Sequence, residues 1–279
     1  MSYQKILVDE PRPRVRRITL NRPDKRNPLS NELRRELFEA LEAADRDPEV
    51  RVTVIRGAGS CFSAGYDLAS DVSRDQPFYT PGGLGNWPRH VVEGFFHMWD
   101  LAKPVIAQVH GYCLAGGTEL ATACDLVYVA DDAKIGYPVV RAISPPDNQF
   151  YPWIVGLRRA MELMLTGDHM SGVEAAQCGF ANRHFPEAEL EDRVLEIAER
   201  VARTPSDLQQ INKRAVHRQM DAMGIRAGLR AGTEMQQLAT FTETARNHLR
   251  ELSRDLTGTL SKRDAEYGDY RTSDGPKDG

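Results

Sequence analysis

Short apolar runs alternate with amphipathic stretches along the first two thirds of the chain. The apolar runs are rich in β-branched residues, which is typical of buried strands. We expect strands at residues 6–8, 15–20, 52–55, 105–109, 126–130 and 133–136. Leu33, Leu37 and Leu41 follow Ser30 at a spacing of four residues, and this pattern predicts a capped amphipathic helix that ends near Asp45.

Helical patterns dominate the rest of the chain, at residues 91–101, 153–166, 173–178 and 187–203 and then onward to about residue 252. Residues 70–88 are polar and rich in Pro and Gly, so we expect a mobile loop that could act as a lid. The pattern divides the chain into an α/β core at 1–204, a helical region at 205–252 and a polar tail at 253–279. We expect the tail to be weakly ordered unless a partner subunit holds it.

The chain is organised around one stretch, Lys103 to Asp125, in which an apolar run enters the turn Ala115-Gly116-Gly117 and a helical run follows. A second small-residue turn, Ala64-Gly65-Tyr66, also follows a strand. Each turn could donate a backbone N–H to one oxygen, and two such donors make an oxyanion hole. The alternative is that both are tight turns packed for geometry alone. Neither turn has the GxGxxG or P-loop pattern of nucleotide-binding proteins.

Glu119 lies in the first turn of the helix that follows Gly116. The helix dipole would stabilise an ionised carboxylate there, and a carboxylate beside an oxyanion hole suits removal of a proton next to a carbonyl. The alternative is a helix-terminal glutamate that contributes only to stability.

Composition narrows the classes of function. The 279 residues carry a net charge of −4 and are 41% hydrophobic and 27% charged, as in an ordinary globular protein. A basic face for nucleic acid or a membrane surface is not expected. We see no signal peptide and no run long enough to cross a bilayer, so we expect a cytoplasmic protein. The four cysteines have no CxxC spacing, which favours reduced, packed thiols and no metal site.

Several collinear motifs together resemble the crotonase superfamily, the enoyl-CoA hydratase/isomerase family. They cover roughly residues 3 to 250, and each is weak alone. The matching segments are Asn21-Arg22-Pro23 with Asn27, Phe62-Ser63-Ala64-Gly65-Tyr66-Asp67-Leu68, Lys103-Pro104-Val105-Ile106-Ala107 with His110-Gly111, Ala115-Gly116-Gly117-Thr118-Glu119-Leu120-Ala121, Cys124-Asp125-Leu126, and Gly156 with Thr166-Gly167.

The resemblance implies a spiral of ββα repeats with a C-terminal helical region that builds trimers, often paired into hexamers. It implies an acyl-CoA substrate, with coenzyme A as part of the substrate and no prosthetic group. It assigns the two oxyanion N–H groups to Tyr66 and Gly116, and the first hydratase glutamate to Glu119. It also places Ala64 and Leu68 at the adenine and pantetheine side of CoA, and the basic residues Lys25 and Arg26 near the CoA phosphates.

The chain departs from the hydratase pattern at one position. Hydratases carry a second glutamate in a pattern like GxPE, and here the run is Gly136-Tyr137-Pro138-Val139, so Val139 takes its place. Asp147 could supply the missing carboxylate, because it lies where the related 4-chlorobenzoyl-CoA dehalogenases carry an aspartate nucleophile. The alternative is an aspartate that only caps a Pro-containing turn.

Other residues are weaker candidates. Tyr137 could donate a hydrogen bond in the site, His97 could border the acyl pocket, and His110 is expected to be structural. Aromatic residues that could line that pocket, or simply belong to the core, are Trp87, Phe95, Phe96 and Trp99. Function therefore has four interpretations: a hydratase/isomerase, a CoA-thioester hydrolase, decarboxylase or dehalogenase using Asp147, a non-catalytic acyl-CoA-binding protein, or a structural trimer without ligand. The sequence determines neither the acyl chain nor the choice between trimer and hexamer.

Overall fold

The strands form two sheets in the computed structural model, which describes residues 3–68, 76–83 and 85–270. The larger sheet has the order β1-β2-β3-β4-β6-β9 and is parallel except for the β1–β2 hairpin. The smaller sheet has the order β5-β7-β8. The strands are β1 (Ile6–Arg12), β2 (Val15–Leu20), β3 (Val52–Gly57), β4 (Val105–Val109), β5 (Tyr112–Leu114), β6 (Leu126–Ala130), β7 (Lys134–Gly136), β8 (His169–Met170) and β9 (Arg183–Phe185).

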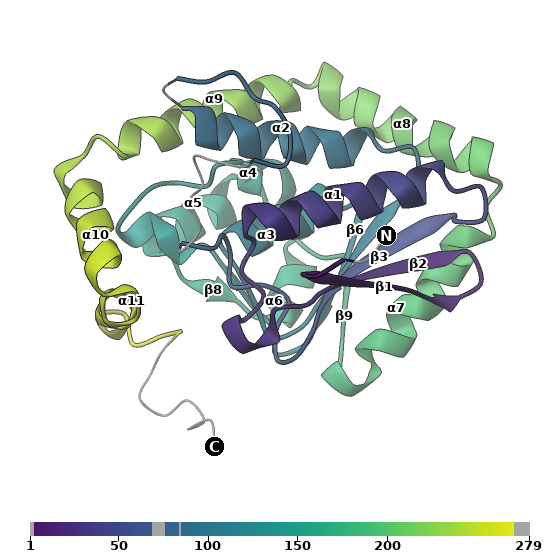
Figure 1. The fold of residues 1–279 in the computed structure, drawn as a ribbon, viewed down its shortest axis with the longest axis horizontal. Helices are drawn as coiled ribbons and strands as arrows, with labels where there is room; N and C mark the ends of the chain where they lie inside the picture. Colours follow the sequence, from purple (N-terminus) through teal and green to yellow (C-terminus); the bar gives the residue numbers. More distant parts are fainter. Residues whose placement is uncertain (1–2, 69–75, 84, 271–279) are drawn as a thin grey trace.

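Helices surround the sheets and fill the C-terminal third (Figure 1). The α-helices are α1 (Asn31–Arg46), α2 (Asn86–Asp100), α3 (Gly116–Ala123), α4 (Tyr151–Ile154), α5 (Gly156–Thr166), α6 (Gly172–Gln177), α7 (Glu187–Ala202), α8 (Ser206–Ala222), α9 (Ile225–Ala239), α10 (Glu243–Arg254) and α11 (Leu256–Ala265). Two 3-10 turns, η1 (Pro23–Lys25) and η2 (Pro138–Arg141), contribute residues to the candidate site.

Two helix boundaries differ from the expectations, and one predicted helix cap agrees with them. Helix α2 begins at Asn86 rather than near residue 91, because Gly85 adopts a left-handed conformation and starts the helix there. The expected helix at 153–166 is divided into α4 and α5, because Gly156 has a positive φ of 74°. The predicted cap of α1 is confirmed, since the Ser30 side chain accepts a hydrogen bond from the Leu33 N–H.

The smaller sheet continues as isolated bridges toward the N-terminal half of the chain. Ser63 bridges Cys113 of β5, and Leu29 bridges Tyr66, in each case in parallel. Successive strand–turn–strand–helix units are therefore stacked beside one another. This arrangement of mixed sheets and surrounding helices agrees with the expected α/β fold class.

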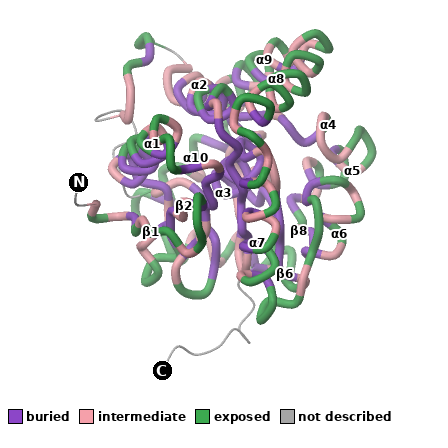
Figure 2. Tube along the Cα trace, turned by 90° about the vertical axis from the view of Figure 1, so that its right-hand side faces the viewer, coloured by how far each residue is buried: buried purple, intermediate pink, exposed green. Residues whose placement is uncertain are grey.

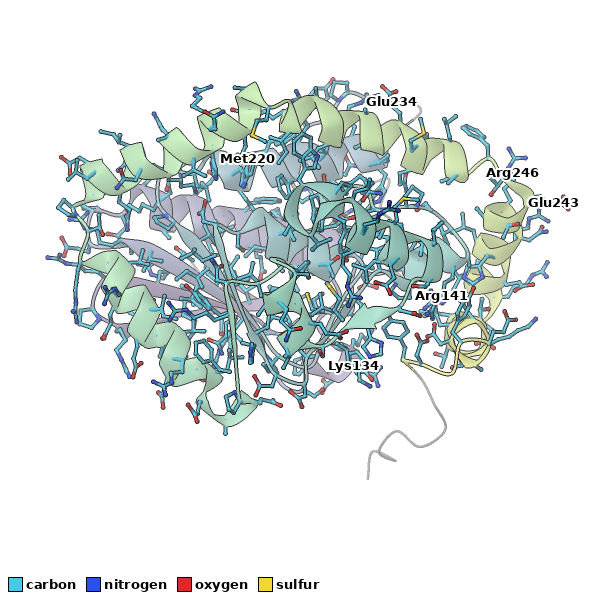
Figure 3. The ribbon with its side chains drawn as sticks, turned by 180° about the vertical axis from the view of Figure 1, so that it is seen from behind. Lys134, Arg141, Met220, Glu234, Glu243 and Arg246 are labelled. Atoms are coloured by element: carbon cyan, nitrogen blue, oxygen red, sulfur yellow. The ribbon has the colours of Figure 1, made fainter. Side chains whose placement is uncertain are left out.

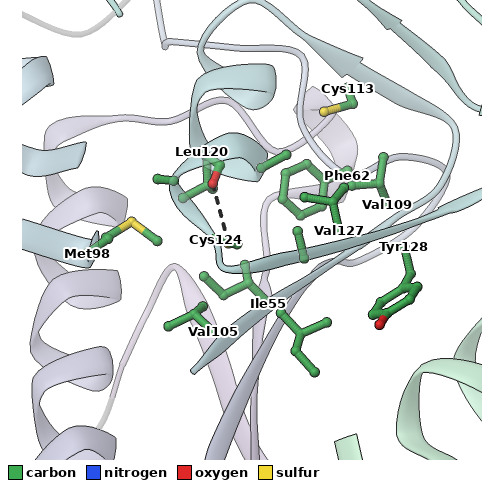
Figure 4. Close-up of a cluster of buried hydrophobic side chains, with 14 of the residues drawn as sticks. Ile55, Phe62, Met98, Val105, Val109, Cys113, Leu120, Cys124, Val127 and Tyr128 are labelled. Carbon is green, nitrogen blue, oxygen red and sulfur yellow. Dashed lines mark hydrogen bonds between the residues drawn. The ribbon is translucent and has the colours of Figure 1, made fainter. Parts of the chain in front are cut away.

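The core lies around α3, a helix whose residues are all buried. Figure 4 shows Leu120 and Cys124 among apolar side chains of the larger sheet, with the Cys124 thiol 3.4 Å from the Leu120 carbonyl oxygen. In Figure 2 α3 is coloured as buried, whereas α8 and α9 carry long exposed stretches. A helix enclosed in this way is held in a fixed position, so its N-terminus can serve as a rigid part of a site.

The C-terminal segment folds back over the rest of the chain. Helices α8 and α9 run along one side in Figure 1, and α10 and α11 then turn down at the end of the molecule. The expectation of a weakly ordered tail from Ser253 is wrong for the described part, because α11 is formed and a charged clamp holds residues 267–270 behind it. In this clamp Arg141 contacts Asp269 at 2.7 Å and lies over the Tyr267 ring at 3.8 Å. Figure 3 shows Arg141 beside the C-terminal helices α10 and α11. Residues 271–279 lie outside the described part.

Other sequence-based expectations are tested only in part. The proposed lid at 70–88 falls partly on residues 69–75 and 84, which are outside the described residues. Its described end packs on α2, where Phe78 stacks on His90 at 4.1 Å. The division at residues 204/205 stays a prediction. Within the described residues, no helix combines the length and the apolar character needed to cross a membrane.

Candidate functional site

The two small-residue turns singled out in the sequence lie side by side. The Leu114 N–H donates to the Ser63 carbonyl at 3.0 Å, which ties the segment before one turn to the segment before the other. A Cβ atom added to Gly65 would lie 3.3 Å from the Gly116 nitrogen. The two turns are therefore close enough for their backbone N–H groups to donate hydrogen bonds to a single ligand atom.

Backbone geometry at the second turn requires small residues. Ala115 has a φ of 50° and a ψ of −120°, a conformation that non-glycine residues rarely adopt. Such strain is typical of functional turns. Gly116 follows it, and a Cβ there would lie 2.7 Å from the Tyr66 ring. The ring of one turn thus packs directly against the backbone of the other.

The N–H groups of Tyr66 and Gly116 remain available as donors. Neither donates to a backbone carbonyl in the turns and loops of the described chain. Gly116 is the first residue of α3, where helical N–H groups have no acceptor within the helix. The pair therefore has the chemistry expected of an oxyanion hole.

Glu119 lies one helical turn further along α3 and is only 2% exposed. Its Oε2 accepts a 2.6 Å hydrogen bond from the Tyr66 hydroxyl, and its Oε1 accepts a 3.1 Å hydrogen bond from the Tyr137 hydroxyl. The backbone N–H of Asp147 also donates to Oε1, at 2.9 Å. The sequence-based suggestion of Tyr137 as a neutral donor in the site therefore agrees with the structure.

Burial raises the pKa of Glu119 to about 7, although the hydrogen bonds from Tyr66 and Tyr137 act in the opposite direction. Burial therefore opposes the stabilisation of the ionised form that was expected from the helix dipole. A dipole at a helix end contributes about 1 kcal/mol, whereas full removal from water disfavours the charged form by more. A carboxyl group that titrates near neutral pH is suited to give and take protons.

Asp147 lies beside Glu119 in the turn before α4 and is 4% exposed. Burial, and then repulsion from the Glu119 charge, raise its pKa well above the usual range. Its Oδ1 has no hydrogen-bond partner among the described residues. Two buried carboxyl groups that repel each other's charge do not both ionise readily, so each opposes the ionisation of the other. Val139, at the expected second glutamate position, lines the same cavity as Asp147.

A cavity of about 460 Å³ is lined by Asp147, whereas Glu119 lines a separate, smaller cavity. The lining of the larger cavity includes all four residues assigned to CoA from the sequence: Lys25, Arg26, Ala64 and Leu68. The C-terminal helices form another part of its wall, which was not predicted from the sequence. The residues they contribute are Gln236, Gln237, Thr240, Leu249, Leu260, Arg263 and Asp264.

A second, small cavity of about 40 Å³ lies on the other side of Tyr66. Gly116, Glu119 and Arg34 are among its lining residues. Arg34 was not predicted from the sequence, but a signal was present. It is four residues after Ser30 and three before Leu37, so it falls on the apolar face of α1.

Several other candidates lie outside the site. His97 is exposed and contacts Glu42 at 3.1 Å, so it does not border either cavity. His110 contacts the Gly59 carbonyl at 2.8 Å, in agreement with a structural role. Trp87 lines the larger cavity and Phe95 the smaller one. Phe96 and Trp99 line neither, and pack instead against Arg226.

Metal ligands would have to come from histidine, cysteine or acidic side chains that lie close together. In the described part of the chain, no group of three or more such side chains is arranged to hold a metal ion. The four cysteines are free thiols, and Cys61, Cys113 and Cys124 are buried.

Known proteins resemble this chain over most of its length. A family model described as enoyl-CoA hydratase/isomerase matches residues 11–269. The mitochondrial enoyl-CoA hydratase of Pongo abelii is 30% identical over 90% of this chain and 83% of its own length. A crystal structure of an enoyl-CoA hydratase/isomerase from Xanthobacter autotrophicus Py2 is 32% identical, with a TM-score of 0.85 over 95% of this chain and 99% of that one. An enoyl-CoA hydratase structure from Mycobacterium smegmatis is 30% identical, with a TM-score of 0.87 over 98% and 99%.

Proposed function

Because the chain belongs to the enoyl-CoA hydratase/isomerase family and is an acyl-CoA enzyme of that type, we propose how its own residues carry out the reaction. The Tyr66 and Gly116 N–H groups hold the thioester oxygen and stabilise the enolate that forms when charge moves onto it. Glu119 is the main acid/base, and Asp147 is the second carboxyl group.

One observation carries this assignment. Glu119 is a buried carboxylate whose oxygens accept hydrogen bonds from the hydroxyls of Tyr66 and Tyr137, and it lies in the first turn of the helix whose N-terminal N–H is free to bind an oxyanion. A base fixed beside an oxyanion hole acts on the carbon next to the thioester carbonyl.

The raised pKa values divide the roles between the two carboxyl groups. With a pKa of about 7, Glu119 is partly ionised at neutral pH and can accept a proton from water as the water oxygen bonds to Cβ. Burial also raises the pKa of Asp147, which favours its protonated form, and that proton can be given to Cα. The electron pair of the double bond passes to the thioester oxygen and returns to Cα as the proton arrives. Paired carboxyl groups in unlike environments commonly share acid and base roles in this way.

Hydration needs both an acid and a base, and Val139 stands where hydratases carry their second glutamate. Asp147 is therefore needed as the second carboxyl group for hydration. Isomerisation, in which one base removes a proton and returns it elsewhere, needs only Glu119. Asp147→Ala is therefore expected to remove hydration of crotonyl-CoA while leaving isomerisation of a 3-enoyl-CoA. Full hydratase activity in Asp147→Ala would contradict the assigned role of Asp147.

The experiment that tests the whole assignment is turnover of crotonyl-CoA by the wild-type protein and by Glu119→Gln. We expect a loss of roughly 10²- to 10⁴-fold in kcat, the usual size of a general acid–base contribution. Glu196→Gln, an exposed glutamate on α7, is the matched control and should retain wild-type turnover. Equal activity in Glu119→Gln would contradict the proposal.

A second candidate is a hydrolase, decarboxylase or dehalogenase that uses Asp147 as a nucleophile. The unpartnered Oδ1 in a buried site favours it. The raised pKa of Asp147 disfavours it, because a protonated carboxyl group is a poor nucleophile. A nucleophilic Asp147 would form an acyl anhydride with release of the CoA thiol or halide, and mass spectrometry of quenched enzyme would detect it.

We further propose that CoA lies in the 460 Å³ cavity, with Lys25 and Arg26 near its phosphates and Ala64 and Leu68 along the adenine and pantetheine side. Ala64 donates its N–H to the Arg26 carbonyl at 2.9 Å, so the basic loop is held beside the first oxyanion turn. This contact supports a continuous path from the phosphates to the thioester.

We infer that the protein assembles as a trimer or hexamer through the C-terminal helices. Large apolar side chains that are at least half exposed lie on α8, α9 and the turn between them, and they support a partner surface; they include Leu208, Ile211, Val216, Met223, Met235 and Leu238. Light scattering on the purified protein tests this, and a monomer at micromolar concentration would contradict it. The cytoplasmic location remains a prediction from the sequence.

A further inference from the structure

Arg34 is a buried cation inside the site that the proposed mechanism does not use. It lies on α1, is 6% exposed and lines the 40 Å³ cavity together with Glu119, Gly116 and Asn148. The remaining lining side chains are largely apolar, among them Leu37, Phe38 and Phe95. A charge in such surroundings is costly unless an acceptor is present.

The acceptors around Arg34 are insufficient for a guanidinium, which carries five N–H donors. Among the described residues Arg34 forms no ion pair, and its hydrogen bond to Asn31 Oδ1 is long, at 3.5 Å. Its other neighbours are the faces of Trp87 at 5.1 Å and Tyr66 at 5.7 Å. Aromatic faces attract the cation but accept none of its hydrogen bonds in the manner of an oxygen.

Arg141 in the same chain provides a direct contrast. Its side chain is 1% exposed, and it contacts both carboxylate oxygens of Asp269 at 2.7 Å and Asp168 at 2.9 Å. That pairing is the usual way in which a protein compensates a buried arginine. Arg34 has no equivalent partner among the described residues, so an acceptor supplied by a bound ligand would compensate its charge.

The carboxyl groups of the site do not provide it. The charges of Glu119 and Asp147 are near enough to interact with that of Arg34, but Glu119 already accepts from Tyr66, Tyr137 and the Asp147 N–H. Burial raises the pKa of Asp147, which opposes the negative charge that a partner of Arg34 would need. No hydrogen bond joins either carboxyl group to Arg34 among the described residues.

The position of Arg34 fixes which part of a substrate it would meet. CoA occupies the larger cavity, and the thioester oxygen binds between Tyr66 and Gly116. The small cavity continues from these residues to Arg34. At about 40 Å³ it has room for roughly three water-sized groups, which matches the end of a short acyl chain.

We propose that Arg34 is a specificity-determining residue that binds a second carboxylate at the far end of a short acyl chain, so that the substrates are dicarboxylyl-CoA thioesters. The inference rests on the proposed function, because it uses the oxyanion hole to set the direction of the acyl chain. The carboxylate supplies the two oxygens that a guanidinium binds in a bidentate manner, and it converts an uncompensated buried charge into a paired one.

The test is equilibrium binding by calorimetry of two matched pairs of unreactive thioesters. Succinyl-CoA is compared with 4-methylpentanoyl-CoA and glutaryl-CoA with 5-methylhexanoyl-CoA, because each pair has the same shape and differs in charge. We expect the wild-type protein to bind at least one dicarboxylyl-CoA about 10- to 100-fold more tightly than its neutral counterpart, the range of a hydrogen-bonded charge. Arg34→Met should abolish this preference, and Arg34→Lys should retain part of it.

Arg35→Met on the same helix is the matched control, because Arg35 is exposed and lines neither cavity. It should keep the wild-type preference. A preference that persists in Arg34→Met, or a wild-type protein without one, would overturn the inference while leaving the proposed function intact. Failure of free CoA and of all four thioesters to bind would instead overturn the proposed function, and the inference with it.

A further measurement distinguishes a purely structural role of Arg34 from binding of a distal carboxylate. If Arg34 only compensates Glu119 and Asp147, Arg34→Met will weaken turnover of crotonyl-CoA and move its pH profile to higher pH. If Arg34 binds the distal carboxylate, KM in Arg34→Met will in addition rise about 10- to 100-fold more for glutaconyl-CoA than for crotonyl-CoA, whereas a merely structural role changes both KM values by the same factor.

Discussion

The Tyr66 hydroxyl donates a 2.6 Å hydrogen bond to Oε2 of Glu119. The same tyrosine presents its backbone N–H at the first of the two oxyanion turns, and its ring packs against Gly116 of the second. One residue therefore links the acid/base group to both donors of the candidate oxyanion hole. A displacement of the Tyr66 ring would alter all three at once.

Removing this hydroxyl should change the pH dependence of turnover. The hydrogen bond lowers the pKa of Glu119 against the effect of burial, which leaves it at about 7. In Tyr66→Phe the pKa rises further, so the ionised base forms only at higher pH and the midpoint of the pH–rate profile moves in the alkaline direction. Turnover of crotonyl-CoA across pH measures it. A midpoint that is unchanged or moves to lower pH would show that Glu119 is not the titrating base.

Gly116→Ala should damage catalysis more than folding. The added Cβ would lie 2.7 Å from the Tyr66 ring, so the ring or the turn has to shift and the two N–H donors separate. Loss of one oxyanion donor lowers kcat by about 10²- to 10³-fold. Steady-state kinetics and a thermal melt of the same sample check this. Gly82→Ala, with no atom within 4 Å of its added Cβ, is the control. Wild-type kcat in Gly116→Ala would contradict the oxyanion assignment.

Arg141→Met should loosen the C-terminal segment that closes the larger cavity. The change leaves Asp269 without its cation and removes the stacking partner of Tyr267. Breaking a buried ion pair from one side costs about 3–5 kcal/mol. We expect faster amide hydrogen exchange in residues 256–270 and a higher KM for acyl-CoA. Arg159→Met, which removes exposed pairs on α5, should leave exchange in this segment unchanged. Equal protection in Arg141→Met and the wild type would refute the role of the clamp.

The basic loop should act on the nucleotide end of CoA only. Lys25→Ala combined with Arg26→Ala is expected to raise KM for crotonyl-CoA by about tenfold without a change in kcat, because ion pairs at a partly exposed site contribute about 1 kcal/mol. Turnover of crotonyl-pantetheine, which lacks the nucleotide phosphates, should be the same in both proteins. An equal rise in KM for both thioesters would place the loop elsewhere along the substrate.

Local patterns predicted the fold because they report which residues are buried. Ser30 caps α1 as its side chain and position predict, and the β-branched runs form the larger sheet. The same reasoning failed from Ser253 onward, since the segment after α11 is held by contacts with residues about a hundred positions earlier or more. The Tyr270 hydroxyl donates to the Gly167 carbonyl, and Arg141 contacts Asp269. The composition of a segment does not show which residues, a hundred positions away in the sequence, will contact it in the folded protein.

By itself the sequence determined that Gly116 opens a helix after a strand, that Glu119 follows in the first turn, and that Val139 replaces a hydratase glutamate. These are properties of neighbouring residues and of a family pattern. Only the tertiary structure decided the burial that raises the pKa of Glu119, the place of Asp147 beside it and the lack of an ion pair at Arg34 among the described residues. The pKa of a carboxyl group and the cost of a buried charge depend on what surrounds them in space. Those surroundings come from α1, α3 and the turn before α4, which the fold brings together.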